Sequence, residues 1–357
     1  VIVGARPGTR GVVATCSYEA RAYGVHSAMS IGEAYRRCPE GVFLPVRHAV
    51  YREHSDRVFR LISSYAHALE RVSIDEAFVD LSLAADPVGT SWEIKRRILS
   101  DVGLVASVGL AANKLVAKIA TDQGKPDGFV VVPHGEEASF LAPLPVARLW
   151  GVGPRTAQRL EALGIRTIGE LAAADATTLV RLFGGHHARE LLERASGRDD
   201  SPVETKREMK SLSDEVTFQR DESDRRVLWK VLRDQAAHCS ARLRERGLVG
   251  RTVTVKMRYA DFRTVTRSVS LVVPTDEPDT LSEVAAALMR QWWAPESRPL
   301  RLLGLRVSRL EAAPRARQLA LLPSQDQRMT TGVPTVAQSQ NHLESARLSP
   351  RQPWLPG

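Results

Sequence analysis

Two adjacent acidic residues interrupt an otherwise apolar run of the chain, Val72-Ser73-Ile74-Asp75-Glu76-Ala77-Phe78-Val79-Asp80-Leu81. Buried like charges repel each other and lose their hydration, so a core that holds both needs a compensating cation, for which Mg²⁺ is the usual choice. In a straight strand Asp75 and Glu76 would face opposite sides, whereas a hairpin bend turns both toward one ion. The run therefore predicts a hairpin with a metal site. A solvent-exposed turn with hydrated acids fits these residues equally well.

The region around this run, residues 1–145, mixes strand patterns with helical periodicity and is expected to be α+β. The expected strands are 1–4, 12–15 and 105–109, and the expected helices are 31–38, 51–69, 92–102 and 112–120. The acidic run is thus expected to follow a helix. Pro126-Asp127-Gly128 indicates a turn after the last of these helices.

Three further segments follow. Residues 146–198 are expected to form a small helical domain, because glycines break the helical pattern repeatedly, at Gly151, Gly153, Gly164, Gly169, Gly184 and Gly185. Residues 199–206 are polar, contain a proline and lack periodicity, which indicates a linker. From 207 to 311 the patterns follow the order β-α-β-β-α-β with a hairpin at 260–262, typical of ferredoxin-like domains. Residues 312–357 are rich in Pro, Gln, Ser and Arg and are expected to be largely disordered.

The charge of the chain suits a polyanionic partner. Lys and Arg outnumber Asp and Glu by 50 to 41, a formal net charge of +9, which fits nucleic acid or an anionic membrane. No apolar run reaches the roughly 18 residues of a membrane span and no signal segment opens the chain, so a cytoplasmic protein is expected. The 3 cysteines are far apart, which fits neither a disulfide framework nor a zinc site. Because the sequence opens on a strand pattern without an initiator methionine, we expect it to be a fragment.

Three blocks of the sequence carry a specific resemblance. Ser73-Ile74-Asp75-Glu76-Ala77-Phe78 resembles the second catalytic motif of the Y-family translesion DNA polymerases, and Ser17-Tyr18-Glu19-Ala20-Arg21-Ala22-Tyr23-Gly24-Val25 resembles their fingers motif. Gly109-Leu110-Ala111-Ala112-Asn113-Lys114-Leu115-Val116-Ala117-Lys118 with Lys125-Pro126-Asp127-Gly128 is similar to a third block, in the same order. The chain is most similar to the bacterial DNA polymerase IV branch, over residues 1–322. This resemblance implies low-fidelity, template-directed DNA synthesis past lesions.

The resemblance also implies a domain plan. Palm and fingers occupy residues 1–145, with the fingers around 5–50 and the first palm strand missing. A helix-hairpin-helix thumb spans 146–198, and 199–206 links it to a ferredoxin-like little finger over 207–311. The tail, 312–357, carries a clamp-binding motif.

The acidic pair is implied to bind the catalytic metals. Asp75 resembles the carboxylate that binds them, and Glu76 the one that helps hold the ion activating the primer 3′-hydroxyl. Two Mg²⁺ ions lower the pKa of that hydroxyl and neutralise the leaving pyrophosphate. In the family a further aspartate binds both ions and is followed by the residue that excludes ribonucleotides, and both motifs would lie upstream of Val1. We therefore expect little or no polymerase activity from the chain as written and primer extension by the full-length protein.

Five residues are implied to surround the incoming nucleotide. Tyr18 and Arg21 lie three apart, on one side of a helical turn, and resemble the residues that contact the β- and γ-phosphates. Lys114 is similar to the palm lysine that contacts the same triphosphate. Ala14 and Ala28 match positions near the nascent base pair, where small side chains leave a pocket that tolerates lesions. The alternative for each charged residue is a solvated surface charge.

Two segments are implied to hold primer–template DNA. Residues 149–165 resemble a helix-hairpin-helix in which Gly151 and Gly153 let backbone N–H groups reach a phosphate and Arg155 follows, although an ordinary glycine-capped corner is the alternative. In the last domain, polar and basic residues on or beside the paired strands resemble the template contact of the little finger. An aggregation-resistant sheet edge is the alternative for them. They are Arg258, Arg263, Thr264, Thr266, Arg267 and Ser268.

The tail contains one more implied contact. Gln318, Leu319, Leu321 and Leu322 resemble the anchors of the clamp-binding pentapeptide, although a stray apolar patch fits the same residues. The implied partners of a monomeric enzyme are primer–template DNA, a dNTP and the sliding clamp.

Two other functions remain open at this point. The main alternative is a non-catalytic protein that binds damaged DNA or primer–template, because the acidic site lacks one ligand. A metal-dependent nuclease is a weaker possibility. Neither explains Tyr18, Arg21 and Lys114 together.

Overall fold

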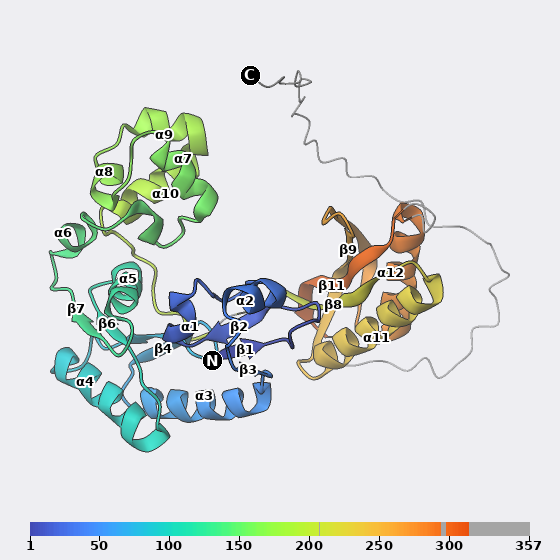
Figure 1. Ribbon diagram of the computed structural model, residues 1–357, viewed down its shortest axis with the longest axis horizontal. Coiled ribbons are helices and arrows are strands. Elements are labelled where there is room, and N and C mark those ends of the chain that lie inside the picture. Colours follow the sequence, from blue (N-terminus) through green and yellow to red (C-terminus); the bar gives the residue numbers. More distant parts are fainter. Residues whose placement is uncertain (207, 294–297, 314–357) are drawn as a thin grey trace. The chain divides into compact units, whose positions relative to one another are not determined.

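The computed structural model describes residues 1–206, 208–293 and 298–313 (Figure 1). Its first sheet has the strand order β2-β1-β3 and contains β1 (Ile2–Gly4), β2 (Val13–Cys16) and β3 (Phe43–Leu44). The helices α1 (Tyr18–Ala22) and α2 (Ile31–Arg37) share one hydrophobic core with this sheet. Ser30 caps the start of α2, and its side chain accepts a hydrogen bond from Glu33 N–H. The strands expected at 1–4 and 12–15 and the helix expected at 31–38 are therefore confirmed.

The acidic run follows a strand and not a helix. α3 (His48–Ser63) ends six residues earlier than the helix expected over 51–69, and β4 (Ala68–Arg71) then pairs antiparallel with β5 (Ala77–Asp80). Hydrogen bonds from the Ser64 hydroxyl to Leu61 O (2.7 Å) and from Tyr65 N–H to Ile62 O (3.0 Å) close the last turn of α3. Leu69 packs against the same core as Ile62. The expected helix was too long because the apolar residues of α3 and of β4 are buried in the same core. A short apolar run does not by itself distinguish the end of a helix from the strand that follows it.

A second strand pair follows this hairpin. α4 (Pro87–Arg97) is capped by Asp86, whose side chain accepts a hydrogen bond from Gly89 N–H, and runs into a π-helical turn, η1 (Ile98–Val102). β6 (Val108–Leu110) pairs parallel with β7 (Phe129–Val131), and α5 (Lys114–Gly124) connects them. The helices expected over 92–102 and 112–120 and the strand expected over 105–109 are present with shifted ends. Among the described residues, β4-β5 and β6-β7 are two separate sheets.

Short helices fill residues 137–195, as the glycine pattern predicts. They are α6 (Glu137–Leu141), the 3-10 turn η2 (Val146–Arg148), α7 (Pro154–Glu161), α8 (Ile168–Ala172), α9 (Ala176–Phe183) and α10 (Gly185–Ala195). Their core, which includes Leu160 and Leu191, is continuous with Leu115 and Ile119 of α5. The domain boundary near residue 145 stays a prediction.

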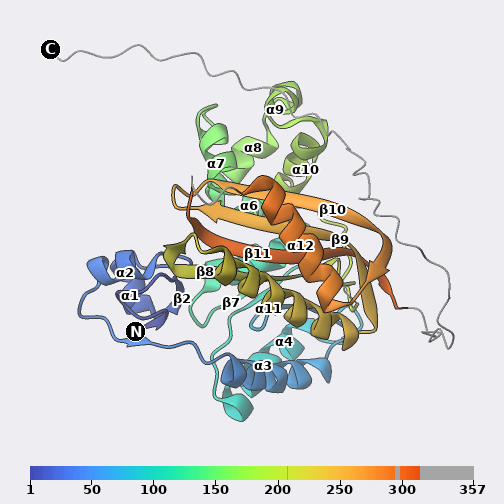
Figure 2. The same cartoon turned by 90° about the vertical axis from the view of Figure 1, so that its right-hand side faces the viewer.

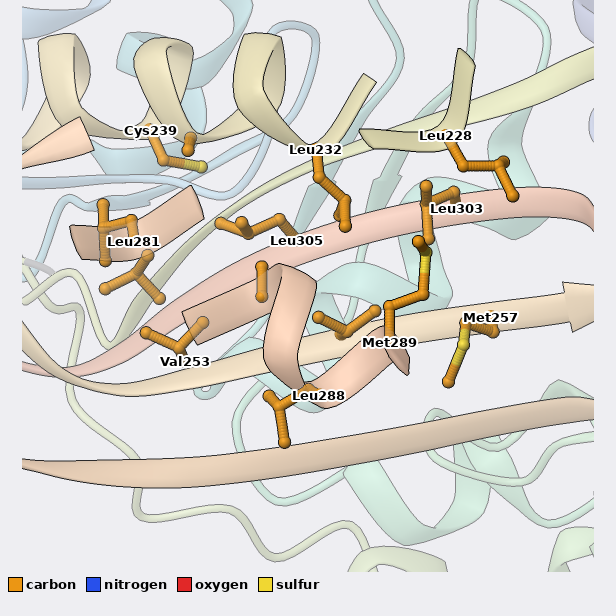
Figure 3. Packing of buried hydrophobic residues seen from close by; sticks show 14 of the residues in the cluster. Leu228, Leu232, Cys239, Val253, Met257, Leu281, Leu288, Met289, Leu303 and Leu305 are labelled. Carbon is orange, nitrogen blue, oxygen red and sulfur yellow. The ribbon is translucent and has the colours of Figure 1, made fainter. Parts of the chain in front are cut away.

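The last region has the expected order β-α-β-β-α-β. Its elements are β8 (Ser211–Glu222), α11 (Arg225–Arg244), β9 (Leu248–Tyr259), β10 (Thr264–Thr275), α12 (Pro278–Trp292) and β11 (Leu300–Ala312). The strand order is β10-β9-β11-β8, and β9 and β10 form the expected hairpin. Figure 2 shows both helices on one side of this sheet. Leu232, Met257, Met289 and Leu303 meet between helices and strands (Figure 3), so the other face of the sheet is left open.

The expected linker contains no helix or strand, but it is tied to other segments. Leu115 N–H donates to Asp199 Oδ2 (3.1 Å), and Glu204 N–H donates to Glu70 Oε2 (3.0 Å). Residues 314–357, including the clamp-binding motif at 318–322, lie outside the described residues. In the described part of the chain, no helix is long and apolar enough to cross a membrane.

Candidate functional site

Asp75 and Glu76 lie in the turn of the β4-β5 hairpin, as the sequence predicts. Two backbone hydrogen bonds close this turn, from Val72 N–H (2.9 Å) and Ser73 N–H (3.2 Å) to Glu76 O. The Ser73 hydroxyl donates to Asp75 Oδ1 and accepts the Asp75 N–H, at 3.2 Å. Ser73 therefore fixes the orientation of the Asp75 carboxylate from within the turn.

The turn is exposed, which matches the solvent-exposed alternative that the sequence left open and not a buried acidic pair. Asp75 is exposed, and its apolar neighbour Ile74 is 51% exposed. The apolar residues Val72 and Ile74 are exposed to solvent in the turn, while Ala77 and Val79 of β5 pack against the core. The desolvation argument for a bound cation therefore does not hold here. What remains is two neighbouring carboxylates accessible from solvent on a closed turn.

Lys118 is the residue beside this pair that the sequence did not single out. Its Nζ lies 2.5 Å from Glu76 Oε1 and 3.5 Å from Asp122 Oδ2, one helical turn along α5. Burial opposes the Lys118 charge, but the hydrogen bond to Glu76 and the charge of Asp122 outweigh it, so the pKa of Lys118 is raised above its ordinary value. The third resembling block contains Lys118, but only the fold shows that it reaches Glu76.

The donor set suits a magnesium ion that shares its ligands with a substrate. Mg²⁺ is commonly held by one or two carboxylates together with substrate phosphates and water. Asp75 and Glu76 supply such a pair of oxygen donors on an accessible turn. Across the described ranges, no group of three or more His, Cys, Asp or Glu could hold a metal. Asp75 and Glu76 are therefore the candidate protein oxygen donors for a divalent ion at this turn.

The residues expected around the nucleotide lie on two parts of the fold. Ala14, Tyr18, Arg21 and Ala28 lie in or next to β2 and α1, whereas Lys114 lies in α5. Tyr18 opens α1, and the Arg21 guanidinium carbon lies 5.7 Å from the centroid of its ring, so the two share one side of the helix as expected. Ala28 lies beside β2, where its N–H donates to Val13 O (2.9 Å), next to Ala14. Ala28 has φ +67°, a left-handed conformation that costs a residue with a Cβ about 1–2 kcal/mol. Such strain is more common at functional sites.

Lys114 lies in a largely buried position. Its Nζ is 2.8 Å from Glu70 Oε2 of β4 and 5.4 Å from the ring centroid of Phe78 in β5. The Lys114 side chain is 11% exposed. In this structure Lys114 bridges α5 and the acidic hairpin, and its contact with a triphosphate stays a prediction.

The two glycines before α7 differ in their surroundings. Gly151 has φ +97°, and a Cβ there would lie 2.2 Å from Arg194 Nη1. Gly153 is the N-cap of α7 and has no atom within 4 Å of its ideal Cβ position, which leaves room for a ligand. Arg155 is exposed in the first turn of α7. A phosphate could therefore approach the backbone at Gly153, although this contact also stays a prediction.

The expected DNA-binding residues of the last domain lie on both faces of its sheet. β9 buries Val253, Val255 and Met257, so its alternate residues face away from the helices. Arg258 is one of these alternate residues, and the β10 residues paired with them share the same open face, namely Thr264, Thr266 and Ser268. Arg267 pairs with Val255, and its guanidinium carbon lies 4.1 Å from the ring centroid of Trp292 on α12.

Arg267 thus lies on the helix side of the sheet, while Arg263 is exposed at the hairpin, where its N–H donates to Asp261. Two basic residues on the open face escaped the sequence analysis. Lys256 alternates with Arg258 on β9, and Arg306 is exposed on β11. Two-residue spacing along each strand would have identified both.

Three family descriptions match the chain. Residues 1–122 match the impB/mucB/samB family, residues 134–165 match the IMS family HHH motif, and residues 209–321 match the impB/mucB/samB family C-terminal domain. The first match contains the acidic hairpin and Lys118, the second the glycine loop, and the third the open sheet face.

Curated relatives are similar over most of the chain. It is 43% identical over 314 residues to DNA polymerase IV of Desulfatibacillum aliphaticivorans, covering 87% of this chain and 78% of that protein. It is 43% identical over 327 residues to DNA polymerase IV of Alkalilimnicola ehrlichii, covering 90% and 91%. Against DNA polymerase IV of Streptomyces coelicolor it is 45% identical over 316 residues, covering 87% of this chain and 65% of that protein. The chain spans just under two thirds of the Streptomyces protein.

Solved structures are similar to this fold. A Y-family DNA polymerase chimera of Dbh and Dpo4 has a TM-score of 0.79 at 27% identity, covering 87% of this chain and 91% of the chimera. The insertion ternary complex of Dbh DNA polymerase has a TM-score of 0.60 at 27% identity, covering 86% and 90%.

Proposed function

Because this chain belongs to the impB/mucB/samB family, in the bacterial DNA polymerase IV branch of the Y-family DNA polymerases, we propose that it serves template-directed DNA synthesis. The reaction is transfer of a deoxynucleotide to a primer 3′-hydroxyl, with release of pyrophosphate. The observation that carries the proposal is the pair Asp75 and Glu76 on an accessible hairpin turn inside the matched region. The similarity to polymerases throughout the chain does not favour the non-catalytic alternative.

In this proposal Asp75 and Glu76 hold the divalent metal, for which Mg²⁺ is our choice. Bound metal ions would activate the 3′-hydroxyl and neutralise charge on the transferred phosphate. Ser73 keeps the Asp75 carboxylate turned to the site. Tyr18 and Arg21 bind the terminal phosphates from α1, and Lys114 contributes from α5.

The site needs one more carboxylate for a second ion. We propose that a further strand supplies it, and that this strand pairs with β5 on one side and with β6 on the other. Each of these strands is paired on one edge only within the described residues, and Lys114 and Lys118 of α5, which follows β6, already contact residues of the β4-β5 hairpin. A strand paired with both would join the two sheets.

Primer extension tests these roles. The first protein is the 357-residue chain, and the second is the same chain fused at Val1 to a strand-forming segment that carries the third carboxylate. We expect little extension by the first, extension in Mg²⁺ by the second, and loss of that activity in its Asp75→Asn and Glu76→Gln variants. Robust extension by the unextended chain, or activity that survives both substitutions, would contradict the assignment.

The remaining partners follow from the same proposal. Primer–template DNA contacts the loop at Gly151 and Gly153 and the open face of the last sheet, without reading sequence. The small residues Ala14 and Ala28 leave space at the base pair, which permits lesion bypass at low fidelity. We also propose that the enzyme is a monomer acting on DNA in the cytoplasm and that residues 318–322 bind the sliding clamp. Deleting 318–322 should abolish stimulation of synthesis by the clamp, and unchanged stimulation would exclude that contact.

A further inference from the structure

Lys118 places a positive charge beside one of the two proposed metal ligands. Its Nζ lies 2.5 Å from Glu76 Oε1, so the two groups form a direct charge-assisted hydrogen bond. The Lys118 side chain is 23% exposed and that of Glu76 is 41% exposed. Water therefore screens the pair only in part. A divalent ion that binds Glu76 through the same oxygen must displace this ammonium or bind next to it.

A second acceptor for Lys118 lies close by. Asp122 Oδ2 is 3.5 Å from Lys118 Nζ and lies four residues further along α5, whereas Asp122 Oδ1 accepts from Lys125 Nζ at 2.7 Å. Lys118 and Asp122 also line a cavity of about 270 Å³ together with residues 147–152. The ammonium thus has a second carboxylate within reach.

We propose that Lys118 is a positioning residue that competes with the metal for Glu76: it occupies the carboxylate when no divalent ion is bound and shifts to Asp122 when one binds. This inference rests on the proposed role of Asp75 and Glu76 as metal ligands. Two cations within a few ångströms of one oxygen repel each other, so full binding of the metal requires the ammonium to withdraw. The lysine would keep the carboxylate oriented while lowering its affinity for the metal.

The competition predicts opposite effects for two substitutions. Lys118→Met keeps the length of the side chain and removes the charge. It should tighten Mn²⁺ binding by about three- to fivefold, because the free energy of a partly exposed ion pair corresponds to a change of that size in Kd. Asp122→Asn removes the second acceptor and should weaken Mn²⁺ binding by about twofold. Lys118→Arg keeps the charge and should stay close to the original affinity.

The experiment titrates the 357-residue chain with Mn²⁺ and follows free Mn²⁺ by electron paramagnetic resonance, which needs no catalytic activity. The decisive comparison places Asp122→Asn in the Lys118→Met background, where the aspartate should have lost most of its effect. A purely long-range electrostatic effect of Asp122 would instead be the same in both backgrounds. Urea unfolding of each variant shows whether the protein is folded.

The outcomes separate the two proposals. Unchanged or weaker Mn²⁺ binding in Lys118→Met overturns the competition if Asp75→Asn with Glu76→Gln still abolishes binding. If that double substitution leaves Mn²⁺ binding intact, the metal site itself is misplaced, and the competition is overturned with it. Tighter binding in Lys118→Met together with the loss of the Asp122 effect supports the inference.

Discussion

Lys114 Nζ lies 2.8 Å from Glu70 Oε2, and the same oxygen accepts the N–H of Glu204. One carboxylate thus connects α5, β4 and the linker at 199–206. The lysine that the resemblance assigns to the triphosphate is therefore also part of the packing beside the acidic hairpin. The two roles can be distinguished by experiment.

We expect Lys114→Met to raise the Kd for a dNTP in Mg²⁺ by roughly tenfold or more, because hydrogen bonds to charged groups contribute about 1.5–3 kcal/mol. Glu70→Gln should leave the Kd unchanged and lower the free energy of unfolding by about 1 kcal/mol, since it removes only the internal partner. Tryptophan fluorescence measures the first quantity and urea unfolding the second. If both variants lose stability but neither changes the Kd, Lys114 is structural only.

The two faces of the last sheet predict different salt dependences for DNA binding. Arg258→Ala removes a charge from the open face and should lower the slope of log K against log salt by about 0.9, the value for one phosphate contact on duplex DNA. Arg267→Ala is the matched control on the helix side. It should leave the slope unchanged and cost about 0.5–1 kcal/mol of stability through the lost contact with Trp292. Fluorescence anisotropy over a range of salt concentrations tests both, and equal slopes in the two variants would refute the assignment of faces.

Ala28 offers a test of backbone strain. With φ at +67°, Ala28→Gly should raise the free energy of unfolding by up to about 1 kcal/mol, because glycine adopts this conformation without a Cβ clash. Ala14→Gly, in strand β2, should instead lower it by about 0.5–1 kcal/mol. Urea unfolding midpoints measure both changes. A loss of stability in Ala28→Gly would show that the left-handed residue is not strained.

The capping box of α8 predicts a pH effect. Glu170 accepts hydrogen bonds from Arg166 N–H (2.6 Å) and Thr167 N–H (3.0 Å), and these lower the pKa of its carboxyl. A lowered pKa contributes stability above the unfolded value of roughly 4.3, and this contribution is lost as the pH falls through the folded value. Glu170→Gln cannot ionise, so its stability should depend less on pH below about 4.5. Urea unfolding at a series of acidic pH values compares the two proteins, and identical pH profiles would contradict the prediction.

The sequence by itself determined the motif positions and many of the local elements, but not the strand β4, which it placed in part within a helix. Ser30 and Asn113 cap helices that begin at the next residue, and the pattern from β8 to β11 gives the observed order of strands and helices. The turn at Asp75 and Glu76 was also predictable, because adjacent acids within an apolar run need a bend to face one side. These features depend on neighbours within a few residues along the chain.

The tertiary structure alone decided the surroundings of the site. Lys118 is 42 residues from Glu76 in sequence, and no local pattern reports such a contact. The exposure of the turn and the separation of Arg267 from Arg258 depend likewise on what packs against each face. Motif spacing therefore identified which residues carry the chemistry, whereas their partners and burial arose from long-range packing, which brings distant segments together.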